Sequence, residues 1–77
     1  DGDTEAAVRR ALAGDEQAFE AVVRAYRGAV WAIAFAVTGD RTGADDLTQE
    51  TFLVAWTERA RLRAPRAFPM WIRTIAR

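Results

Sequence analysis

Three carboxylates and one amide are concentrated in a short stretch of the chain, at Asp45, Asp46, Gln49 and Glu50. Carboxylates at such spacing could transfer protons in catalysis or bind a basic partner. The chain contains no cysteine and no histidine, so the commonest metal ligand and general base is missing, and nothing pairs a nucleophile with a base. We therefore expect no enzymatic activity, no bound metal and no cofactor.

The acidic stretch has a second property if residues 44–61 form a helix, because positions three and four apart then share one face. Asp46, Gln49, Glu50 and Leu53 obey this spacing. One interpretation is a solvated face with a single exposed leucine, an ordinary feature of protein surfaces. The other is a protein-docking face, in which carboxylates meet a basic partner and Leu53 is a desolvated anchor. Periodicity alone does not decide between the two.

The C-terminal part of the chain is rich in arginine. No acid follows Glu58, whereas six arginines do: Arg59, Arg61, Arg63, Arg66, Arg73 and Arg77. Because the guanidinium group binds phosphate in a bidentate way, this end suits contact with nucleic acid. Arginines that are merely solvated are the alternative, since any small helical protein can carry them at its surface.

The elements that must position these residues are helices. The 77 residues are enough for one small domain, and 51% of them are apolar, too many for a disordered segment. Seventeen alanines and other helix formers dominate, so we predict an all-α fold, a compact bundle of about four helices. The chain starts without methionine and stops in mid-pattern, so we expect a fragment of a longer protein.

Hydropathy bears on where the protein acts. The longest apolar run, residues 29–37, is roughly half as long as a membrane span. No secretory signal pattern opens the chain. We expect a cytoplasmic protein without membrane insertion.

Capping residues mark the first two helices. Asp3 or Thr4 is suited to cap a first helix that runs to about Ala13 and ends at Gly14. Asp15 is suited to cap a second helix that ends at Gly39. Its apolar positions keep helical spacing on more than one side, so we predict that this helix is central, with core positions Phe19, Val22, Tyr26, Val30, Ile33 and Val37.

Proline and glycine mark the other two helices. We expect a turn at Thr42–Gly43, a third helix over Ala44–Arg61, and a linker at Pro65. The third helix has the predicted core face Ala44, Leu47, Thr48, Thr51, Phe52 and Ala55. A fourth helix begins near Ala67, with Pro69 in its first turn and with Phe68, Trp71, Ile72 and Ile75 on its apolar face.

Three motifs together resemble a known family. They are GDEQAF at residues 14–19, DDLTQETFLVAW at residues 45–56, and LRAPRAFPMWIRTIAR at residues 62–77. In this order they resemble region 2 of extracytoplasmic-function sigma factors, over almost the whole chain. The middle motif is the most specific, because DLxQExFxxAW on a helix is characteristic of that family. Two positions depart from the pattern: Val54 stands where the family often has a basic residue, and Pro69 or Met70 where it has a more polar one.

The resemblance implies a single domain over residues 1–77 that acts in bacterial transcription initiation. Such a domain docks on the clamp helices of the RNA polymerase β′ subunit, through positions that correspond here to Asp46, Gln49, Glu50 and Leu53. It also recognises the promoter −10 element as single-stranded DNA, and the loop between its third and fourth helices holds a flipped base. In this chain that loop contains Arg61, Leu62, Arg63 and Arg66, and a plain connector with solvated arginines is the alternative interpretation. On the fourth helix, helical spacing places Met70, Arg73, Thr74 and Arg77 on the face opposite the apolar one, so we expect this face to bind DNA, with Arg73 and Arg77 as the best candidates for phosphate contact.

A different class of function fits the same residues. The chain could be a sigma-like protein-interaction module that binds an anti-sigma factor without recognising a promoter. An anti-sigma factor is also a possible further partner under the first interpretation.

Overall fold

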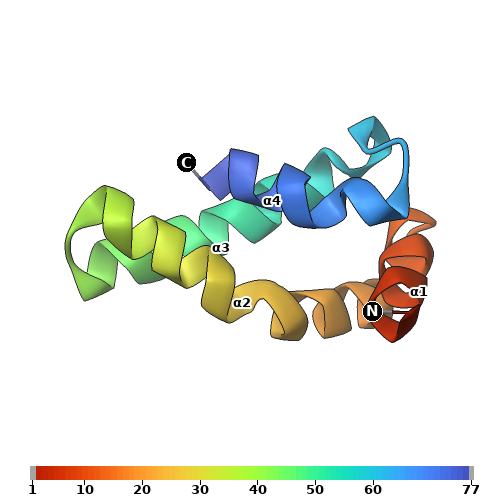
Figure 1. Ribbon diagram of the computed structural model, residues 1–77, viewed down its shortest axis with the longest axis horizontal. Coiled ribbons are helices and arrows are strands. Elements are labelled where there is room, and N and C mark those ends of the chain that lie inside the picture. The colour runs from red at the N-terminus through yellow and green to blue at the C-terminus, as the bar shows by residue number, and fades with distance from the viewer. Residues whose placement is uncertain (1, 77) are drawn as a thin grey trace.

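The computed structural model describes residues 2–76. They form four α-helices, α1 (Gly2–Leu12), α2 (Glu16–Thr38), α3 (Arg41–Thr57) and α4 (Phe68–Ala76), and two 3₁₀ turns, η1 (Arg59–Arg61) and η2 (Pro65–Ala67) (Figure 1). Over this described range there is no strand. The predicted all-α bundle is therefore confirmed.

Helix α2 has the boundaries that its caps predict. The side chain of Asp15 accepts a hydrogen bond from the backbone N–H of Ala18 at 3.1 Å. At the other end Gly39 has φ 80°, a left-handed conformation that favours glycine, and its N–H donates to the carbonyl of Phe35 at 2.8 Å. Both ends are fixed by local chemistry, which is why the sequence alone located them.

Helix α3 begins three residues earlier than predicted. The turn expected at Thr42–Gly43 lies inside the helix, because Asp40 is the N-cap and accepts from the N–H of Gly43 at 2.6 Å. The glycine has a packing reason instead. A Cβ atom on Gly43 would lie 2.9 Å from the Cβ of Thr38, so its absence lets the ends of α2 and α3 approach closely.

The other end of α3 also differs from the prediction. The helix stops at Thr57 rather than at Arg61, and the chain continues through η1. Glu58, between them, has φ −98° and ψ 15°, and its N–H still donates to the carbonyl of Val54. Residues 59–61 are arginine and alanine, which favour an α-helix, so the sequence did not predict that the last turn would tighten into a 3₁₀ turn.

The ends of α1 and α4 lie close to their expected places. Helix α1 starts at Gly2, so Asp3 and Thr4 lie in its first turn rather than before it, and it ends one residue before Ala13. Helix α4 starts at Phe68, with Pro69 in its first turn as predicted.

Helix α2 is the central element. It packs against α1, α3 and α4, and α4 also packs against α3 (Figure 1). The side chains buried most fully come from all four helices and include Val8, Val22, Val30, Thr51 and Ile72. Phe52 of α3 and Phe68 of α4 belong to the same core cluster, with Phe19, Tyr26 and Ile33 half-buried against it.

One core prediction for α2 is wrong. Val37 is 57% exposed. The α2–α3 hairpin projects beyond α4, so its tip is covered on one side alone (Figure 1). There the closest packing uses small side chains, Ala34 and Ala44, both fully buried. The sequence period placed Val37 on the apolar stripe but did not reveal where the covering helices stop.

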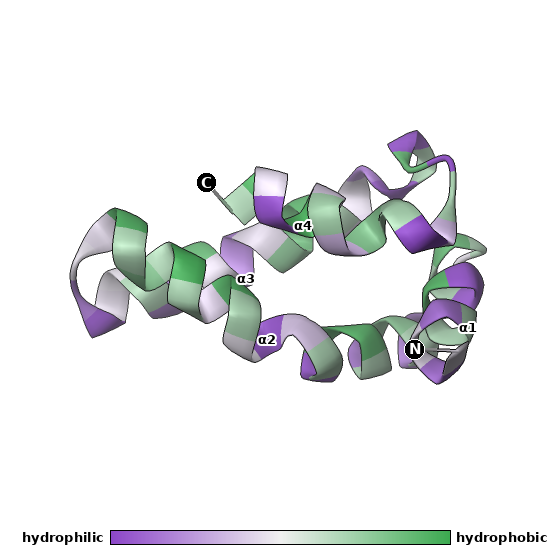
Figure 2. Cartoon of the chain, in the orientation of Figure 1, coloured by the Kyte–Doolittle hydropathy of each residue, from purple (hydrophilic) through white to green (hydrophobic). Residues whose placement is uncertain are grey.

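Helix α2 is also unusually long and apolar. By length and hydropathy alone, this helix is long and apolar enough to cross a membrane. The hydrophobic residues are prominent in its second half (Figure 2). One helix of this kind is weak evidence of a membrane span, and in this fold α2 packs against α1, α3 and α4.

Candidate docking face and nucleic-acid interface

The inward side of α3 fixes the orientation of its outward side. Of the predicted core face, Ala44, Thr48, Thr51, Phe52 and Ala55 are buried, whereas Leu47 is only half-buried. The hydroxyl of Thr51 donates to the carbonyl of Leu47 at 2.6 Å, one turn earlier, and so is satisfied within the helix. The buried hydroxyl of Thr48 has no hydrogen-bond partner among the residues that the structure describes.

The outward side of α3 carries the predicted docking residues. Asp46, Gln49, Glu50 and Leu53 are all exposed and line one shallow depression, which we call the docking face. Leu53 is 64% exposed, so the free domain leaves an apolar side chain in contact with water, which is unfavourable. Neither Asp46 nor Glu50 forms an ion pair within residues 2–76. The face thus combines unpaired negative charge with an exposed apolar side chain.

Asp45 has a different role from its neighbour Asp46. Its carboxylate accepts a hydrogen bond from the indole N–H of Trp31 at 2.8 Å, which links α3 to α2. Sequence reasoning did not find this link, because the two residues are 14 positions apart and no local pattern joins them. Asp45 therefore helps to hold the hairpin together, whereas Asp46 faces solvent.

Two of the five C-terminal arginines that the structure describes have local partners. The guanidinium of Arg59 lies 4.0 Å from the centre of the Trp56 ring and donates to the Trp56 carbonyl at 2.7 Å. Arg61 lies 2.7 Å from the carboxylate of Glu58. Because that pair is exposed, it stabilises the fold little, and a phosphate group could replace the carboxylate at small cost.

The remaining described arginines are more accessible. Arg63, Arg66 and Arg73 are exposed and form no ion pair with another residue in the range 2–76. Arg63 and Arg66 lie in the loop between α3 and α4, and Arg73 lies on α4. Arg77, also predicted to bind DNA, lies outside the described residues.

The loop between α3 and α4 is anchored by apolar contacts. Leu62 is half-buried against the core cluster, and Phe68 at the loop's end is buried. Pro65 begins η2, which packs against α1. An opening of about 190 Å³ lies between this loop and α1, lined by Thr4, Glu5, Val8, Tyr26, Pro65, Arg66 and Pro69. Of the predicted loop residues, Leu62 thus points inward, while Arg63 and Arg66 remain exposed.

Helix α4 presents the outward face that its period predicts. Met70 is 72% exposed, and Arg73 and Thr74 are exposed beside it. The Thr74 hydroxyl donates to the carbonyl of Met70 at 3.0 Å. On the opposite face Phe68 and Ile72 are buried. Arg73 is thus free to reach a ligand without disturbing the core.

The three tryptophans are half-buried and packed against other rings. Trp31 lies beside Phe35, Trp56 beside Phe19, and Trp71 beside Phe68, with ring centres 5.0–6.0 Å apart. These contacts indicate that the tryptophans serve packing first. Within residues 2–76 no group of three or more acidic, cysteine or histidine side chains is arranged to hold a metal ion.

Comparisons with known proteins agree with this arrangement. The family model described as sigma-70 region 2 matches residues 22–77. The chain is 43% identical over 67 residues to a "Probable RNA polymerase sigma factor RfaY" of Xanthomonas campestris pv. campestris. That match covers 87% of this chain and 17% of the relative, so the chain spans a small part of the relative's length. No solved structure matches the chain significantly.

Proposed function

The chain belongs to the sigma-70 region 2 family, and from this membership we propose that it acts in the cytoplasm as the polymerase- and promoter-binding domain of an extracytoplasmic-function sigma factor. In this role it docks on the clamp helices of the RNA polymerase β′ subunit and binds the −10 element as single-stranded DNA. The family is not enzymatic, and polymerase performs the chemistry.

The observation that carries the docking proposal is the composition of the docking face. Asp46, Gln49, Glu50 and Leu53 gather on one side of α3, and Leu53 is exposed although a leucine gains by burial. A basic partner would neutralise the carboxylates and remove Leu53 from water, as a central anchor in an interface does.

The DNA proposal is supported by a second surface, on the loop and α4. Arg63, Arg66 and Arg73 supply unpaired guanidinium groups that suit the phosphates of a melted strand. The anchored loop between α3 and α4 supplies a fixed frame in which one extruded base could be read. The docking face uses α3 and the DNA surface uses the loop and α4, so the two partners do not compete for the same residues.

Binding to core RNA polymerase tests the docking proposal. Glu50→Arg and Leu53→Ala are each expected to weaken binding by on the order of 1–2 kcal/mol, because one removes charge complementarity and the other truncates the anchor. Val37→Ala is the control for Leu53→Ala, since Val37 is similarly exposed and lies at the tip of the α2–α3 hairpin. Circular dichroism should show the same helical content in all variants. Unchanged affinity of both docking variants would contradict the proposal.

A further inference from the structure

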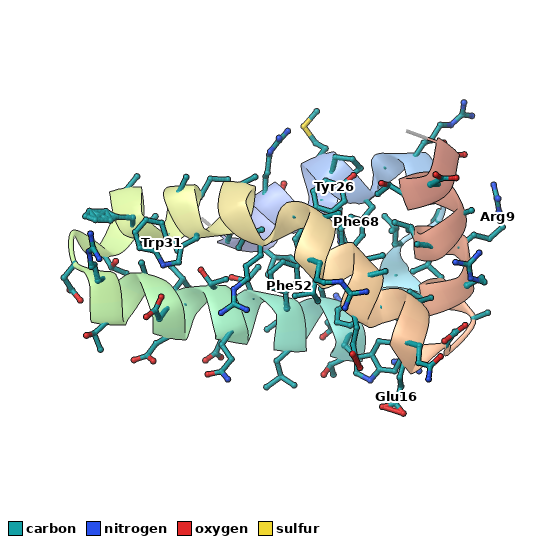
Figure 3. All side chains as sticks on the ribbon, turned by 90° about the horizontal axis from the view of Figure 1, so that it is seen from below. Arg9, Glu16, Tyr26, Trp31, Phe52 and Phe68 are labelled. Carbon is teal, nitrogen blue, oxygen red and sulfur yellow. The ribbon has the colours of Figure 1, made fainter. Side chains whose placement is uncertain are left out.

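A groove adjoins the docking face where the start of α2 meets the second half of α3. Phe19, Phe52 and Trp56 form its floor, and Glu16 and Glu20 of α2 form one edge. The other edge is formed by Gln49 and Leu53, which also belong to the docking face. Figure 3 shows Phe52 between the two helices and Glu16 at the outer edge near the start of α2. The groove and the docking face are therefore one continuous surface.

The floor of this groove is aromatic and partly open. The ring of Phe19 lies 6.4 Å from that of Phe52 in an edge-to-face arrangement and 5.0 Å from that of Trp56. Phe19 and Trp56 are only half-buried, so the three rings do not close over one another. Together with the residues of the two edges they line an open, shallow hollow of about 340 Å³. Filling such a hollow with an apolar side chain of a partner removes apolar surface from water and so favours binding.

The edge of the groove carries unpaired negative charge. Glu16 and Glu20 are exposed and form no ion pair with any other residue in the range 2–76. The same is true of Asp46 and Glu50 on the adjoining docking face. Two of these carboxylates line the apolar hollow and the other two lie beside the exposed leucine, a pattern that suits an interface with a desolvated centre and a polar rim. A symmetric contact with a second copy of this chain does not suit this surface, because the acidic face of that copy would repel these acids.

We propose that the groove receives an apolar side chain from a basic helix of core RNA polymerase, and that Glu16 and Glu20 extend the docking face from α3 onto α2. This inference rests on the polymerase docking proposed above. In this contact Leu53 is buried against the partner, and the groove floored by Phe19 accepts an apolar side chain from it. A helix is the expected partner, because the groove lies between two helices, a shape that suits an amphipathic helix.

The charge at the groove edge is tested by the rate of association with core polymerase. The double substitution Glu16→Gln and Glu20→Gln removes two negative charges without changing side-chain size. Its association rate at low ionic strength is expected to fall roughly threefold to tenfold, with a weaker dependence on salt. The control is Asp3→Asn with Glu5→Gln on α1, which makes the same charge change outside the groove. The control should keep the rate of the unsubstituted chain.

The occupation of the groove is tested separately by thiol protection. The chain has no cysteine, so a single cysteine reports on one position. Glu20→Cys is expected to be protected from alkylation when core polymerase binds. The comparison is Ala25→Cys, which lies on the same helix, is exposed and does not line the groove. That variant should remain reactive in the complex, as read by mass spectrometry of the chain's peptides.

The outcomes separate the inference from the docking proposal. If Leu53→Ala and Glu50→Arg weaken binding, docking stands. If, in addition, the double substitution at positions 16 and 20 behaves like its control, or Glu20→Cys remains reactive in the complex, the groove inference is overturned. If none of these variants changes binding, the docking proposal fails and the inference fails with it.

Discussion

Two neighbouring apolar residues of α3 have opposite surroundings. Phe52 is 7% exposed and packs against the Phe19 ring, whereas Leu53 is 64% exposed. Helical spacing predicted this division, because positions three and four apart must share a face. The same rule placed the four docking residues together. It could not predict the Trp31–Asp45 hydrogen bond or the position of Arg59 over Trp56, which depend on how side chains pack in three dimensions.

At the scale of the residue, the different surroundings of Phe52 and Leu53 predict that replacing each by alanine lowers the stability of the fold by different amounts. Phe52→Ala should lower the free energy of unfolding by about 3–5 kcal/mol, because it leaves a cavity in a small core. Leu53→Ala should leave that free energy nearly unchanged. Thermal unfolding followed by circular dichroism measures both. A Phe52→Ala variant that keeps the midpoint of the unsubstituted chain would mean that the core face of α3 is assigned wrongly.

The helices themselves show where sequence reasoning succeeds. Asp15 and Gly39 bound α2 as predicted, because each end is determined by one residue's own hydrogen bond or dihedral angle. Gly43 led to a wrong boundary, because a glycine permits both a turn and close helix packing, and only the second applies here. The tip of the hairpin was also misjudged at Val37, since helical period does not reveal how far a neighbouring helix extends.

At the scale of the element, two glycine substitutions should have opposite effects on the stability of the fold. Gly28→Ala lies within α2 where an added Cβ meets nothing within 4 Å, so it should stabilise the fold by roughly 0.5–1 kcal/mol through helix propensity. Gly43→Ala should instead destabilise it by about 1 kcal/mol or more, because the new Cβ would collide with Thr38. For a domain of this size each kcal/mol shifts the melting temperature by about 4–8 °C. Equal shifts would show that Gly43 is not a packing glycine.

The whole molecule places its two candidate surfaces on different elements. The sequence predicted this separation, because its acidic helix and its arginine-rich end are distinct segments of the chain. The family follows from the same motifs, and the match to sigma-70 region 2 confirms it. The groove was not predicted, because its two edges come from α2 and α3 and become neighbours only after folding.

At the scale of the molecule, DNA binding should depend on salt. Phosphate contacts release counterions, and the logarithm of affinity for a single strand falls by about 0.7 per neutralised phosphate for each tenfold rise in salt. Three or four contacts would therefore give a slope of roughly −2 to −3. Arg73→Ala should weaken binding to all sequences alike and flatten the slope by about 0.7. Titration of the polymerase-bound chain with −10 oligonucleotides measures both effects.

Arg73→Ala is compared with substitutions in the same arginine-rich segment. Substitutions at Arg63 and Arg66 in the loop should change the preference among bases as well as the affinity, because base identity is read where a base is extruded. If Arg73→Ala leaves both affinity and salt slope unchanged, α4 does not contact the strand.

The anchored loop between α3 and α4 has a consequence for how tightly a strand can be held. Leu62 and Phe68 fix its two ends to the core, and Pro65 restricts the backbone between them. Ordering a flexible side chain at an interface costs roughly 0.5–1.5 kcal/mol of conformational entropy. Ordering the backbone of a loop adds to this cost, and because the backbone of this loop is already anchored in the free domain, that part of the cost is met during folding. A strand that reaches this loop would therefore meet a preorganised binding site. Differences in affinity between bases would then reflect the contacts that each base makes, and not the free energy needed to order the loop.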